Sequence, residues 1–149
     1  MKDFKQEIWN LARMKFGEIT EDLEQRLIVE VDAIKEYGRG EMLHTMWRLV
    51  DELKKHDINI CLTLGQGYNV SLVCYLLGIS SFNPIDHPKL KTESYVISTF
   101  KLSSEIVFKI DNNQSAVIDG FLYSLRYEVT RVDVPGDFHS RRIKACCEG

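Results

Sequence analysis

The chain has 149 residues, a length typical of one domain and sufficient to bury a hydrophobic core. Hydrophobic residues make up 44 % and charged residues 28 %, an ordinary globular composition, and the net charge of −3 excludes a global basic field that would draw the chain onto nucleic acid. No apolar run in the sequence reaches the roughly 18 residues that a membrane-spanning helix requires. The cysteines show no metal-binding spacing, so we expect a reducing, cytoplasmic location and no metal site built on them.

Apolar spacing predicts three helices at the start of the chain. The first covers residues 4–16 and ends at Gly17, and the second follows Thr20, which is a suitable N-cap. The third covers residues 40–57, with apolar side chains on one face and charged side chains on the other. Residues 1–57 are therefore predicted to be mainly helical.

Strands and helices alternate in the rest of the sequence. Residues 58–64 form a short apolar run typical of a buried strand, and the Gly65-Gln66-Gly67 turn leads from it into a predicted helix over 69–77. Further strands are predicted at 95–100, 105–111 and 127–134, and further helices from Asn112 or Asn113 to about Leu125 and over 137–147. We predict one domain over 1–149 of the α/β or α+β class, in which residues 58–149 form a mixed sheet with flanking helices.

Several residues occur in an order that resembles a known family. The resemblance is dense from Phe4 to Ile85 and weaker beyond. The family is the C-family bacterial replicative DNA polymerase, the DNA polymerase III alpha subunit. Its motif positions correspond here to Arg26-Leu27, Glu30-Val31, Gly65-Gln66-Gly67, Ser71-Leu72-Val73, Tyr75, Leu77-Gly78-Ile79-Ser80 and Pro84-Ile85. The resemblance implies a degenerate fragment of the polymerase palm, with a nucleotidyltransferase-like mixed sheet.

The resemblance also implies where catalytic aspartates would lie. Two metal-binding aspartates are expected on the strand that reads EIVFKID here, but the alignment places Val107 and Lys109 on their positions, with Asp111 on a third acid. Nucleotidyl transfer needs two metal ions held by clustered carboxylates. Glu105 and Asp111 are six residues apart, roughly 20 Å along an extended strand, so they cannot together bind the two metal ions. We therefore expect no catalytic residue, no metal and no cofactor, with Mg²⁺ required only if the chain is active through another acid set.

The glycine turn is a candidate phosphate site, because free backbone N–H groups at a helix start bind anions. Tyr68 and Val70 crowd this turn, and Gln66 stands where the family has an arginine that would clamp phosphate. The turn is therefore either a phosphate site or inherited architecture, and Lys109 is either a solvated lysine or a cation that replaces the metal. The phosphate-binding candidates are Gly65, Gln66, Gly67, Ser71 and Lys109.

A basic run near the end of the sequence is a candidate nucleic-acid contact. It would bind nucleic-acid phosphate or an acidic partner, or else be the solvated end of a helix. Its residues are Arg131, Arg141, Arg142 and Lys144.

These observations favour a stand-alone, catalytically inactive relative of the polymerase palm. It would act as a binding or regulatory module in DNA replication or metabolism, with nucleotide or DNA phosphate and replication or mobile-element proteins as partners, and no membrane. Two alternatives stay open: a minimal active nucleotidyltransferase, and a structural domain that docks on protein through exposed apolar residues.

Overall fold

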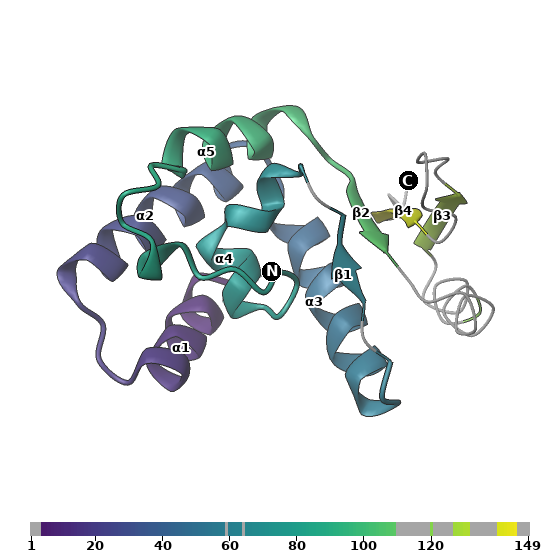
Figure 1. Cartoon of the computed structure of the whole chain (residues 1–149), viewed down its shortest axis with the longest axis horizontal. Helices are drawn as coiled ribbons and strands as arrows, with labels where there is room; N and C mark the ends of the chain where they lie inside the picture. The colour runs from purple at the N-terminus through teal and green to yellow at the C-terminus, as the bar shows by residue number, and fades with distance from the viewer. Residues whose placement is uncertain are drawn as a thin grey trace.

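A computed structural model describes residues 4–58, 60–63, 65–109, 120, 127–131 and 140–145, the last two segments as backbone (Figure 1). Figure 1 shows the helices packed together, with β2, β4 and β3 lying to one side of them. None of the helices in the described part of the chain is long and apolar enough to span a membrane.

The first three helices confirm the sequence prediction. They are α1 (Phe4–Phe16), α2 (Glu21–Glu36) and α3 (Gly40–Lys55). The side-chain oxygen of Thr20 accepts a hydrogen bond from the Leu23 N–H at 3.3 Å, so Thr20 is the N-cap of α2 as predicted. Gly17 follows α1 with a φ of 77°, a left-handed conformation that stops the helix and that glycine adopts without strain.

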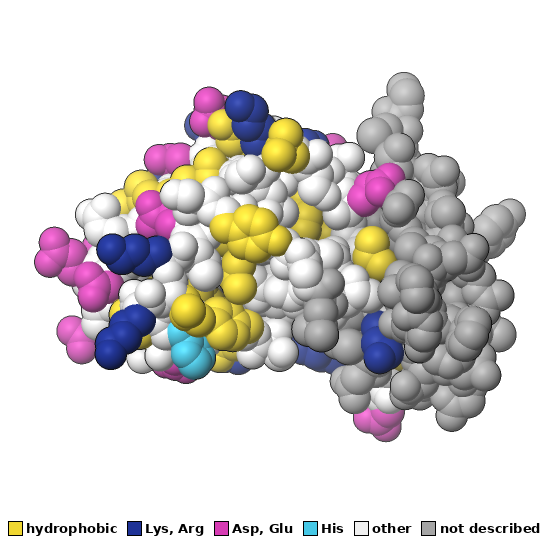
Figure 2. All heavy atoms as spheres, turned by 45° about the horizontal axis from the view of Figure 1, so that its top comes forward, with side chains coloured by type: hydrophobic (Ala, Val, Ile, Leu, Met, Phe, Trp, Pro, Cys, Tyr) yellow, Lys and Arg dark blue, Asp and Glu magenta, His cyan; other side chains and the backbone are white. Residues whose placement is uncertain are grey.

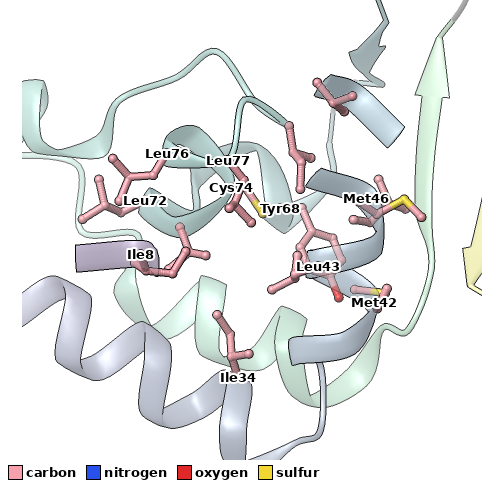
Figure 3. Packing of buried hydrophobic residues seen from close by; sticks show 14 of the residues in the cluster. Ile8, Ile34, Met42, Leu43, Met46, Tyr68, Leu72, Cys74, Leu76 and Leu77 are labelled. Carbon is pink, nitrogen blue, oxygen red and sulfur yellow. The ribbon is translucent and has the colours of Figure 1, made fainter. Parts of the chain in front are cut away.

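The hydrophobic core lies between these helices and a short fourth helix, α4 (Leu72–Leu76). Ile8 of α1, Ile34 of α2 and Leu43 of α3 are fully or almost fully buried and belong to one cluster with Leu72 (Figure 3). Tyr68, which precedes α4, is 1 % exposed and lies in the same cluster. The residues that directly follow Gln66 are therefore packed into the core of the described helices.

The strand and helix predicted around the glycine turn are both shorter than expected. The strand predicted over 58–64 is reduced to β1 (Cys61–Leu62), which precedes the turn. The helix predicted over 69–77 is divided into a 3-10 helix, η1 (Gly67–Val70), and α4, because Ser71 between them is extended with a ψ of 129°. Ser71 is thus an N-cap, which has non-helical backbone, rather than an interior helical residue.

The segment after α4 contains a second correction. A short 3-10 helix, η2 (Pro84–Asp86), is followed by α5 (Glu93–Leu102), so the strand predicted over 95–100 is wrong. Val96 and Phe100 are fully buried and lie four residues apart, which places them on one face of a helix. α5 packs on α2 and η1, and this tertiary contact overrides the β preference of the local residues.

The remaining described strands are β2 (Ile106–Lys109), β3 (Tyr127–Arg131) and β4 (Ser140–Ala145). β2 and β3 confirm the strand predictions for their residues. The basic helix predicted over 137–147 is wrong, because its residues 140–145 form β4, which pairs with β2 on one side and β3 on the other. Apart from Gly120, the helix predicted from Asn112 or Asn113 to about Leu125 lies outside the described residues.

The predicted fold class is wrong. The described part of the chain is mainly helical, and its strands, in the order β1-β2-β4-β3, pair only in antiparallel fashion. A mixed sheet needs parallel neighbours joined by crossover segments, and the segment expected to supply one such strand is α5. The arrangement therefore does not support a nucleotidyltransferase fold, and the single-domain assignment stays a prediction.

Candidate functional site at the glycine turn

The turn between β1 and η1 begins with a residue that must be glycine-like. Gly65 has a φ of 89°, a left-handed conformation that other residues adopt at a cost. Its carbonyl accepts a hydrogen bond from the Tyr95 hydroxyl of α5 at 2.8 Å. The turn is thus held to α5 at its first residue.

Gln66 joins the turn to β2. Its side-chain nitrogen donates to the Val107 carbonyl at 2.6 Å, and its side-chain oxygen accepts from the Val107 N–H at 2.9 Å. The same nitrogen also donates to the hydroxyl of Thr63 at 2.7 Å. Both polar ends of Gln66 are therefore used inside the protein. A glutamine makes these bonds where the family resemblance expected a phosphate-binding arginine.

Gly67 is needed because η1 and α5 pack very closely. A Cβ atom added at Gly67 would lie 1.7 Å from the Thr99 hydroxyl oxygen and 2.7 Å from the Thr99 Cβ. Gly67 is buried and does not have a left-handed φ, so its requirement is steric rather than conformational. Glycine is thus favoured at Gly65 by the backbone conformation and required at Gly67 by the lack of space for a side chain.

Two titratable groups near the turn are held in their neutral forms. Burial raises the pKa of the Tyr68 phenol to about 12, and the Tyr68 hydroxyl donates a hydrogen bond to the Ser103 carbonyl. Burial likewise raises the pKa of the Cys74 thiol to about 12. A thiol in this environment is a packing group and not a nucleophile.

Ser71, a predicted phosphate contact, binds a carboxylate of the protein itself. The Ser71 hydroxyl donates to one oxygen of Glu30 at 2.6 Å and accepts from the Cys74 N–H at 3.1 Å. The N–H groups of Leu72 and Val73 donate to Glu30 at 2.8 Å and 3.1 Å. The start of α4 therefore already holds an anion, and phosphate binding through Ser71, which stays a prediction, would have to displace it.

Arg26 completes this buried network. Its Nε donates to Glu30 at 2.6 Å, one turn further along α2. A terminal nitrogen of Arg26 donates to the Val70 carbonyl at 2.9 Å and to the Thr92 hydroxyl at 3.0 Å. Arg26 and Glu30 therefore connect α2 with the end of η1, the start of α4 and the segment that enters α5.

An open hollow of about 240 Å³ lies beside the turn, between η1 and α5. None of the residues in its wall carries a charged side chain. The lining residues are Gln66, Gly67, Tyr68, Tyr95, Ser98, Thr99, Leu102 and Ser103. Such a wall suits an uncharged group better than a phosphate.

Hydrophobic side chains are exposed on α5 and in the segment just before it. Leu90 is 56 % exposed, Tyr95 51 % and Leu102 78 %. Figure 2 shows hydrophobic side chains gathered across the middle of the described surface, whereas charged side chains gather at its left end.

The predicted metal-binding strand is β2, in which Val107 is half-buried and Lys109 is exposed at the last position. Asp111, the predicted third acid, lies outside the described residues. Among the residues that the structure describes, no three His, Cys, Asp or Glu side chains lie together in a way that could hold a metal ion.

The basic candidates lie on β4, which is next to β2, and on β3, which is next to β4. In the backbone register, Arg142 of β4 stands between Val107 of β2 and Thr130 of β3, and Arg141 stands opposite Arg131. Lys144 of β4 stands opposite Glu128. The structure thus brings the basic run beside the strand that Gln66 contacts, although not as the helix end that was predicted.

Sequence reasoning missed most of the groups that hold this site together. Arg26 and Glu30 carried a detectable signal, since opposite charges four residues apart on a helix are positioned to pair. Tyr95 and Thr99 carried none, because their segment was predicted to be a strand. The bond from Gln66 to Val107 spans 41 residues of sequence, and local patterns do not contain it.

Comparison with known families defines the class of protein. The profile of the family described as "Bacterial DNA polymerase III alpha NTPase domain" matches residues 2–144. The chain therefore belongs to this family. No solved structure matches the chain.

Two curated relatives are both described as "Error-prone DNA polymerase". They come from Anaeromyxobacter dehalogenans strain 2CP-C and from strain 2CP-1 / ATCC BAA-258, and each is 35 % identical over 75 residues. The aligned part is 50 % of this chain and 6 % of each polymerase. The chain thus corresponds to a small fraction of the length of these relatives.

Proposed function

We propose that this member of the DNA polymerase III alpha family is catalytically inactive and serves as a binding or regulatory module in DNA replication. The observation that carries this proposal is the identity of Val107 and Lys109 at the strand positions where the family resemblance expects metal-binding aspartates. A valine cannot coordinate Mg²⁺, and the exposed ammonium of Lys109 repels it.

The hydrogen bonds of the glycine turn support the same proposal. Gln66 and Ser71, two of the phosphate-binding candidates, direct their polar atoms to Val107 and Glu30. Polar groups that are satisfied within the protein give little binding energy to a ligand, because a ligand must first replace those bonds. The turn therefore supports an architectural role more than a phosphate-binding role.

The first experiment measures nucleotide incorporation. The chain is incubated with Mg²⁺, deoxynucleoside triphosphates and a primed DNA template, and we expect no extension of the primer. Metal-dependent incorporation would contradict the proposal and favour a minimal active nucleotidyltransferase. Titration of a nucleoside triphosphate against Lys109→Glu tests the cation separately: a role beside phosphate requires weaker binding by the variant than by the unmodified chain.

The second experiment tests DNA binding through the basic residues of β3 and β4. We expect binding of labelled single-stranded DNA that weakens as salt is raised, since phosphate contacts release counterions. Arg142→Ala with Lys144→Ala, two positions on the same face of β4, should reduce the slope of log K against log salt by roughly 1.4, the value for two lost phosphate contacts on a single strand. Lys54→Ala with Lys55→Ala, two adjacent cations at the end of α3, is the matched control and should leave the slope unchanged.

One observation favours a different function. The exposed side chains of Leu90, Tyr95 and Leu102 would suit a surface that docks on another protein. Self-association or protein binding that is insensitive to salt, together with an absence of DNA and nucleotide binding, would support this protein-interaction function and contradict the DNA-binding proposal.

A further inference from the structure

The pair formed by Arg26 and Glu30 is buried and reaches unusually far along the chain. The two side chains are 11 % and 0 % exposed, and their closest atoms are 2.6 Å apart. Arg26 contacts Val70, which lies 44 positions later in the sequence, and Thr92, which lies 66 positions later. A single ion pair thus connects three segments that are distant in sequence.

The contacts of this pair are well matched to its charges. The Glu30 carboxylate accepts bonds from the Ser71 hydroxyl, from two N–H groups at the start of α4 and from Arg26. The Arg26 guanidinium donates to Glu30, to a backbone carbonyl and to a hydroxyl. A buried ion pair of this kind gives little net stability, because desolvation of two charges offsets their attraction, but removal of either partner leaves an uncompensated charge.

We propose that Arg26 and Glu30 form a conformational latch, which fixes the end of η1, α4 and the start of α5 on α2 in one arrangement without a bound ligand. A shift of α4 along α2 would take the Leu72 and Val73 N–H groups away from Glu30. A shift of α5 would take Thr92 away from Arg26. Either displacement leaves a buried charge with fewer partners, so displaced arrangements are penalised, whereas an apolar contact of similar size would tolerate them.

According to the latch hypothesis, the pair contributes little to the free energy of folding but holds the contacting segments in one position. The folding equilibrium and amide hydrogen exchange test these two statements. Arg26→Met and Glu30→Met are made singly and together. Each single change should lower the equilibrium constant of folding at least ~100-fold, whereas the double change should return it to within ~10-fold of the unmodified chain. In the double variant the amides of Leu72 and Val73 should nevertheless exchange with solvent at least ~10-fold faster, while buried amides of α1 and α3 keep their rates.

The exposed pair of Asp51 and Lys55 is the matched control. Its atoms are 3.7 Å apart, it also lies four residues apart on a helix, and both side chains are 64 % exposed. Asp51→Asn and Lys55→Met, alone or together, should change the folding constant by no more than about threefold. Equal effects of the buried and exposed pairs, or unchanged exchange at Leu72 and Val73 in the double variant, would overturn the latch.

A milder substitution covers the case in which the double variant does not fold. Thr92→Val removes the contact between Arg26 and α5 and leaves Glu30 and α4 intact. We expect the amides in the first turn of α5 to exchange at least ~3-fold faster, with no change at Leu72. If the double variant is unfolded and Thr92→Val leaves α5 as protected as before, the proposal is wrong.

Discussion

The substitution Gly67→Ala tests the close packing of η1 on α5. The added Cβ would lie 1.7 Å from the hydroxyl oxygen of Thr99, so either the Thr99 side chain must rotate or the two segments must separate. Rotation alone is insufficient, because the Thr99 Cβ would still be 2.7 Å away. Overpacking of this kind costs about 1–3 kcal/mol. The backbone of Gly67 is not left-handed, so the conformational effect of alanine is neutral or slightly stabilising and does not explain a loss.

Urea unfolding of a double-mutant cycle measures this cost. Gly67→Ala and Thr99→Ala are compared singly and together, and the double variant should be more stable than the sum of the single effects predicts by about 1 kcal/mol. Recovery stays partial because the Cβ of residue 99 is retained. Ser98→Ala, at an exposed neighbouring position of α5, is the control. A free energy of unfolding for Gly67→Ala within ~0.5 kcal/mol of the unmodified chain, or strict additivity in the cycle, would refute the steric explanation.

Three further predictions concern the same region. Gln66→Leu should lower the free energy of unfolding by about 1–3 kcal/mol, because the Val107 N–H loses its side-chain partner; an unchanged urea midpoint would contradict this role. Glu30→Gln, which removes the negative charge but little volume, should destabilise the chain by about 3 kcal/mol in the same assay, and full stability would show that Arg26 needs no counter-charge. The contribution of Cys74 and Tyr68 to the free energy of unfolding should be fully present below pH 9 and should fall as the pH rises toward 12. The reason is that their pKa values are raised in the folded chain, so the unfolded chain loses these protons first. Between pH 9 and 10, Cys74→Ala should remove about 1 kcal/mol of this loss, and equal pH profiles for the two proteins would show that the buried thiol is not responsible.

The helices of the first part were predictable because their signals are local. Thr20 is an N-cap and Gly17 is a helix stop. The apolar residues of α1 to α3 recur with a helical period, and the side chains on that face are buried. The segment over α5 was mispredicted because it is rich in β-preferring residues, and only its packing on α2 and η1 makes it helical. β4 was mispredicted because strand pairing with β2 and β3 involves residues far away in sequence.

The candidate site was predictable in position but not in its bonding. The Gly65-Gln66-Gly67 turn and the strand of Val107 lie where the sequence placed them, whereas Ser71, expected inside a helix, is the N-cap of α4. The sequence does not show that Ser71 binds Glu30 or that Gln66 binds Val107, because both contacts connect residues about 41 positions apart. The resemblance identified the residues of the turn, and the structure supplies a non-catalytic reason for several of them.

The order of strands has a consequence for how the molecule forms. β4 comes last among the described strands, yet it lies inside the sheet between β2 and β3. Until residues 140–145 have been synthesised, β4 is not available to pair with the edge of β2 that it covers in the folded chain. An unpaired strand edge promotes association with other chains. Completion of this sheet must therefore follow synthesis of nearly all of the described chain, whereas the helices from α1 to α3 can form earlier from local contacts.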